Sequence, residues 1–96
     1  MTIGQFCETI YPICVRYGGS VTSWIRSPER NKKVGGTDDS RHIYGWAVDV
    51  ALDDPEGITF IRSGQMSNKD AFFNECVRQG LKPIESNDGA IHVQTP

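Results

Sequence analysis

The chain has 96 residues and a mass of 10.7 kDa, a size typical of one domain with one modest core, so we expect a single domain over residues 1–96. Ten lysines and arginines against 12 aspartates and glutamates give a net charge of −2, which lacks the basic excess of a nucleic-acid-binding protein. No segment approaches the roughly 18 apolar residues that span a bilayer. We therefore expect a monomer with neither a nucleic-acid partner nor a membrane partner.

The first ten residues, MTIGQFCETI, contain neither the basic nor the apolar region of a signal peptide. This predicts cytoplasmic synthesis without a signal peptide. The chain also has an odd number of cysteines and no CxxC spacing, which argues against a disulfide framework. We expect Cys7, Cys14 and Cys76 to be buried free thiols on helix faces.

A first helix is predicted after Thr2, because Gln5 stands three residues later as in a capping box. Apolar residues then recur at helical spacing: Phe6, Ile10, Ile13, Cys14 and Tyr17. Gly18 ends the pattern. Pro12 predicts a kink or a break near Tyr11, since proline removes a backbone donor and clashes with the preceding turn.

The next segments predict two strands separated by a long loop. The segment 20–25 is short and contains β-branched residues, which predicts a strand. The segment 26–41 is polar, with one proline and two glycines, which predicts a loop. Residues 45–51 alternate: Trp46, Val48 and Val50 should face a core, and Ala47, Asp49 and Ala51 the opposite side. The small residues therefore leave room around Asp49.

The second half predicts a strand, a helix and two closing strands. Residues 58–61 form the strand, and Ser67 with Asp70 caps the helix, whose stripe ends at Gly80: Phe72, Phe73, Cys76 and Val77. Residues 81–84 and 90–94 are strands joined by a turn of Asn, Asp and Gly. The fold class is α+β, a small antiparallel sheet packed by two helices.

The only two histidines stand in contexts that suit a metal ligand. His42 ends the long loop, and His92 lies on the strand face opposite to the core-directed Ile91 and Val93. Together with Asp49 they would bind Zn²⁺ tetrahedrally and leave one position open for water, the arrangement of a catalytic site. An exposed histidine and a strand aspartate are also common without any metal.

The segment from Ser23 to Val50, SWIRSPERNKKVGGTDDSRHIYGWAVDV, resembles the zinc-site signature of the D-Ala-D-Ala metallopeptidases. This group includes D,D-carboxypeptidases, D,D-dipeptidases and phage endolysins, and its fold is similar to that of the hedgehog signalling domain. The matching positions are Ser23, Arg26, Ser27, Asn31, Gly35, Gly36, Ser40, His42, Gly45, Ala47 and Asp49. IHVQ around His92 resembles the closing ligand strand, whereas Trp24 departs from the glycine usual there.

The resemblance implies a zinc peptidase that acts on D-amino-acid-containing peptides of bacterial peptidoglycan, as a carboxypeptidase or an endolysin-type endopeptidase. It implies that His42, Asp49 and His92 hold the zinc. It also implies that Arg26 projects into the cleft, to bind a substrate carboxylate or to stabilise the oxygen of the attacked carbonyl. Ser40 either donates a hydrogen bond to the substrate or fixes the loop.

The general base is where the sequence departs from the family pattern. A carboxylate usually stands three residues before the last histidine, and here that residue is Gly89. Asp88 is the nearest acid and Glu85 the next, so each is a candidate catalytic residue. Asp88 is equally suited to shaping the turn alone.

Two alternatives remain open. One is an inactive zinc-binding module of the same fold that acts in binding. The lack of a carboxylate three residues before His92 favours this alternative. The other is a structural component of a phage particle, which explains the size but not the matched positions. A phage origin would suit a short lytic protein that reaches the cell wall through a holin.

Overall fold

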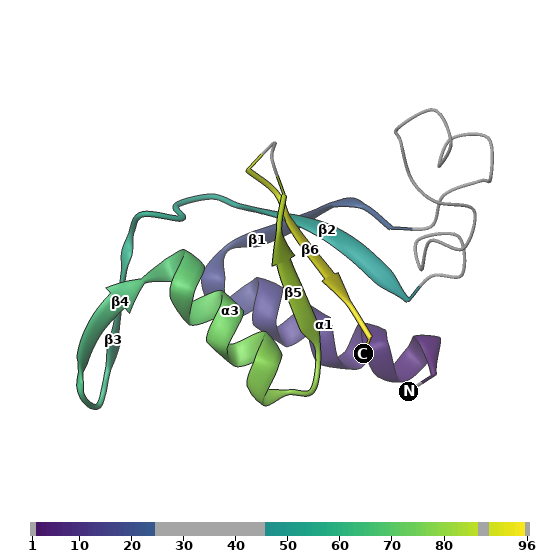
Figure 1. Cartoon of the computed structure of the whole chain (residues 1–96), viewed down its shortest axis with the longest axis horizontal. Coiled ribbons are helices and arrows are strands. Elements are labelled where there is room, and N and C mark those ends of the chain that lie inside the picture. Colours follow the sequence, from purple (N-terminus) through teal and green to yellow (C-terminus); the bar gives the residue numbers. More distant parts are fainter. Residues whose placement is uncertain (1, 25–45, 87–88, 96) are drawn as a thin grey trace.

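The computed structural model of the chain describes residues 2–24, 46–86 and 89–95 (Figure 1). The elements in these residues are α1 (Ile3–Tyr17), β1 (Gly19–Ser23), β2 (Ala47–Leu52), β3 (Ile58–Ile61), β4 (Gly64–Ser67), α3 (Asn68–Arg78), β5 (Lys82–Glu85) and β6 (Ile91–Gln94). They confirm the predicted α+β class with two helices and antiparallel sheets. The predicted loop over residues 26–41 lies outside the described residues.

Helix α1 begins and ends where the sequence predicts. The Thr2 hydroxyl accepts a hydrogen bond from the backbone N–H of Gln5, the Gln5 side chain accepts one in return, and Gly18 ends the helix at φ 69°. Of the kink or break predicted near Tyr11, the break is wrong, because the helix continues through Pro12. Pro12 and Glu8 are both exposed, so water can replace the donor that the Glu8 carbonyl loses.

The four-stranded sheet has the order β1-β2-β6-β5, and every neighbouring pair is antiparallel. Both helices cover one face of this sheet, with their buried sides toward it (Figure 1). The core between helices and sheet is a single cluster of apolar side chains: Phe6, Ile10, Ile13, Cys14, Val48, Val50, Phe72, Cys76, Leu81, Ile91 and Val93.

The two central strands alternate as the sequence predicts. Val48 pairs with Val93 and Val50 pairs with Ile91, and all four side chains are buried in the core. Residues between them on each strand must point to the opposite face of the sheet. We call that face, which carries Asp49, the site face.

Strands β3 and β4 form a separate two-stranded sheet, which extends beyond one end of the helices (Figure 1). Strand β3 has the bounds that the sequence predicts. Strand β4 is not predicted, because its sequence, GQMS, begins with glycine and contains no β-branched residue.

Helix α3 confirms the predicted cap, since the Ser67 hydroxyl accepts a hydrogen bond from the Asp70 backbone at 3.1 Å. Phe72 and Cys76 are fully buried. Val77 is 63% exposed, so the predicted apolar stripe is wrong at that position. One residue after Cys76 the helix has turned by about 100°, which carries Val77 away from the core. No helix in the described part of the chain is long and apolar enough to cross a bilayer.

Candidate metal centre

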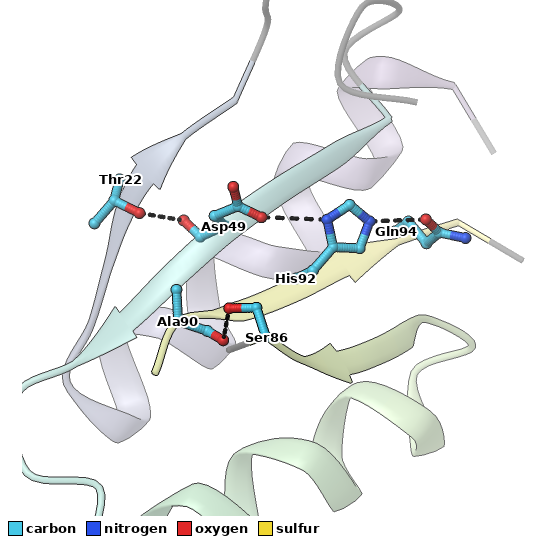
Figure 2. Close-up of polar contacts among 6 residues, drawn as sticks. All are labelled: Thr22, Asp49, Ser86, Ala90, His92 and Gln94. Carbon is cyan, nitrogen blue, oxygen red and sulfur yellow. Dashed lines mark hydrogen bonds and ion pairs between the residues drawn. The ribbon is translucent and has the colours of Figure 1, made fainter. Parts of the chain in front are cut away.

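Asp49 and His92 meet on the site face of the sheet. They are direct partners in the β2–β6 ladder, and Oδ1 of Asp49 lies 3.2 Å from Nδ1 of His92 (Figure 2). Their side chains are 21% and 22% exposed, so both are largely shielded yet still reachable from solvent. The two residues are 43 positions apart in sequence and are brought together only by the strand pairing.

The spacing of these two atoms fits a metal ion. Two ligands at zinc–oxygen and zinc–nitrogen distances of 2.0–2.2 Å in a tetrahedral site lie about 3.3–3.6 Å apart. The observed 3.2 Å is close to the short end of this range, and a protonated histidine paired with aspartate also gives this distance. Within residues 2–24, 46–86 and 89–95, no group of three histidine, cysteine or acidic side chains is assembled.

A bulge in β1 fixes the strand next to Asp49. Val21 pairs with Val50 and Ser23 pairs with Asp49, so Thr22 is the extra residue. The Thr22 hydroxyl donates a hydrogen bond to the Asp49 carbonyl at 3.3 Å (Figure 2). As a result, Ser23 stands opposite Asp49, and the chain leaves β1 beside the candidate metal centre.

A cavity of about 330 Å³ lies at the end of β2 and β6. Its lining includes Ala51 and Ala90, from the face that carries Asp49 and His92, but also Leu52 and Ile91, which pack on the helix-covered face, and Lys69 of α3. The cavity is therefore at the end of the sheet and is not confined to the site face.

The family model described as Peptidase M15 matches residues 5–92 of the chain. The chain belongs to the peptidase M15 family. This confirms the resemblance to the zinc D-Ala-D-Ala peptidases and identifies a metallopeptidase domain of a typically zinc-dependent family. Searches of curated proteins and of solved structures found no match.

Of the site residues predicted from the sequence of this M15 peptidase domain, the structure brings Asp49 and His92 together. The third predicted ligand, His42, lies outside the described residues, as do the predicted substrate-binding residues Arg26 and Ser40. Asp88, the first candidate base, is also outside them.

Glu85, the second candidate base, is not brought to the pair. It is the ladder partner of Ile91, whose side chain is in the core, whereas Ile84 is the partner of His92. Glu85 thus lies on the helix-covered side of the sheet, and its Oε1 accepts a hydrogen bond from Lys69 Nζ at 2.9 Å. That hydrogen bond raises the pKa of Lys69.

The cysteines are free, as predicted, and Cys14 and Cys76 are buried in the core whereas Cys7 is half-buried. Burial raises the pKa of Cys14, and it raises that of Cys76 to about 12. Both thiols therefore remain protonated at neutral pH. Because both lie in the core, on the face of the sheet opposite to Asp49 and His92, neither is a suitable fourth ligand.

Gln94 is a site residue whose contact the sequence analysis missed. Its Oε1 lies 2.8 Å from Nε2 of His92, on the side of the ring away from Asp49 (Figure 2). The spacing of two residues on one strand placed it on the face of His92, but not against the ring.

Proposed function

We propose that this M15 peptidase binds zinc through His42, Asp49 and His92 and hydrolyses D-amino-acid-containing peptide bonds of bacterial peptidoglycan. The observation that carries the proposal is the 3.2 Å approach of Asp49 to His92 in a chain that the family model matches over residues 5–92. Carboxylate oxygen and imidazole nitrogen are both ligands that zinc prefers. His42 precedes Asp49 by seven residues, as in the zinc-site signature.

A bound zinc ion polarises a scissile carbonyl and makes water a nucleophile at neutral pH. Around it, the chain's own residues divide the remaining work. Arg26 binds a substrate carboxylate or the carbonyl oxygen on which charge develops. Ser40 donates a hydrogen bond to the substrate, and Asp88 accepts the proton of water and returns it to the leaving amine.

A second candidate function is a zinc-binding module without catalysis. Gly89 occupies the position of the usual base, and Glu85 is turned away and hydrogen-bonded to Lys69. Of the two candidate bases, Asp88 is then the one left for proton transfer. Zinc binding without turnover, in protein with Asp88 intact, would favour this module.

The test is digestion of purified muropeptides, with products identified by mass spectrometry. Zinc-loaded protein should release D-alanine or sever cross-bridges, and removal of zinc by a chelator should stop the reaction until zinc is returned. His92→Ala should be inactive, whereas Asp53→Asn, an exposed carboxylate just beyond β2, should retain activity. Turnover that persists in His92→Ala, or no turnover by zinc-loaded protein, would contradict the peptidase.

A further inference from the structure

Gln94 contacts the imidazole of His92 on the side opposite to Asp49. Oε1 of Gln94 lies 2.8 Å from Nε2, and Oδ1 of Asp49 lies 3.2 Å from Nδ1, so each ring nitrogen has its own oxygen partner (Figure 2). The amide and the carboxylate thus hold the ring between them. Both contacts come from the site face of the two central strands.

The chemistry of Gln94 decides which ring nitrogen carries hydrogen. An amide oxygen only accepts hydrogen bonds, so Nε2 of His92 must be the donor in this contact. On the other side of the ring, Nδ1 is the nitrogen that faces the Asp49 carboxylate. A metal ion held by Asp49 and His92 together would therefore meet Nδ1, while Nε2 keeps its hydrogen for Gln94.

We propose that Gln94 is a positioning residue, which holds His92 in the Nε2–H tautomer and thereby assigns Nδ1 as the atom that binds metal. This inference rests on the zinc-binding part of the proposed function and not on peptidase activity. Metal-ligating histidines generally donate their second ring N–H to an acceptor, and Gln94 supplies that acceptor here.

The surroundings of Gln94 leave its amide available for this role. Its ladder partners are Ala47, which is too small to reach the ring, and Lys82, which is exposed. The backbone ladder holds β6 whatever the side chain at this position. Loss of the amide should therefore release the ring rather than the strand, and the ring can then rotate and exchange its two nitrogens.

The experiment uses the full chain with ¹⁵N-labelled histidine, loaded with zinc and observed by long-range proton–nitrogen NMR, together with zinc affinity from competition with a chelator. Wild type should show Nδ1 of His92 bound to metal and Nε2 protonated. Gln94→Ala should weaken zinc binding by about 10–100-fold and speed solvent exchange of the Nε2 proton. Gln94→Glu, which keeps an acceptor oxygen, should restore most of the affinity.

Gln65→Ala is the matched control, because it removes an exposed amide from β4 in the separate hairpin. Zinc bound through Nε2 in wild type would overturn the inference, and this result needs no variant to fold. Gln94→Ala that binds zinc as tightly as Gln65→Ala would also overturn it, as would wild type that binds no zinc. Zinc on Nδ1 without any muropeptide cleavage would overturn the peptidase and leave the role of Gln94 intact.

Discussion

Glu85 and His92 lie on opposite faces of the sheet, although their strands are neighbours. Glu85 is paired in the ladder with the buried Ile91 and hydrogen-bonds Lys69 on α3, whereas His92 faces Asp49. A base must reach the water that it deprotonates. Proton transfer in the proposed reaction therefore falls to Asp88.

Substitutions of the two candidate bases, Asp88 and Glu85, form a matched pair. Asp88→Asn should bind zinc normally yet lose nearly all turnover, because the amide cannot accept the proton. Glu85→Gln should keep turnover within a few-fold and leave stability nearly unchanged, since its ion pair with Lys69 is exposed. Muropeptide kinetics and urea unfolding measure both effects. A fully active Asp88→Asn, or an inactive Glu85→Gln, would refute this assignment.

Removal of metal should lower the melting temperature by several degrees at least. Zinc that binds the folded state alone adds about 2.7 kcal/mol at a free concentration 100 times its Kd. In a domain of this size each kcal/mol corresponds to roughly 4–8 °C. Calorimetry before chelation, after it, and after zinc is returned checks the effect. Identical melting curves, with zinc loss verified by mass spectrometry, would argue against a bound metal.

Phe72 and Phe60 provide a contrast between core and surface. Phe72 is fully buried between the helices and the sheet, so Phe72→Ala should cost about 3–5 kcal/mol of unfolding free energy. Phe60 is 81% exposed on β3, and Phe60→Ala should change the free energy of unfolding by less than about 0.5 kcal/mol. Urea unfolding of both variants measures the difference. Equal losses would show that the hairpin is packed against something in solution.

Cys76 should make the fold sensitive to alkaline pH. Its pKa is raised by burial to about 12 in the folded protein, from an ordinary value of 9.0. Between these values the unfolded chain releases the proton and the folded chain keeps it, so the free energy of unfolding falls as pH rises. Cys76→Ala should show a shallower decline above pH 9 in urea unfolding. An unchanged slope would exclude this thiol as the cause.

The sequence predicts those parts of the fold that depend on local signals. Thr2, Gln5 and Gly18 set the ends of α1, and the alternation from Val48 to Val50 sets the two faces of β2. The break at Pro12 was wrong because an exposed position tolerates the lost hydrogen bond. Strand β4 was missed because its stability comes from pairing with β3 rather than from its own residues.

The sequence predicts which residues form the site, but not how these residues contact one another. The sequence identifies Asp49 and His92 as ligand types on strands, yet their register depends on a pairing across 43 residues that no local pattern encodes. The same limit explains why the contacts of Gln94 and Glu85 could not be predicted. The sequence places Gln94 on the strand face of His92, but the contact of Gln94 with the His92 ring depends on packing. The hydrogen bond between Glu85 and Lys69 depends on packing as well.

The most direct test of the metal centre is the zinc content of the intact chain by native mass spectrometry, comparing wild type with Asp49→Asn, His92→Ala and the exposed control Asp53→Asn. We predict one zinc ion in wild type and in Asp53→Asn, and none in the other two variants. Zinc retained by both Asp49→Asn and His92→Ala, or absent from wild type in excess zinc, would contradict the account.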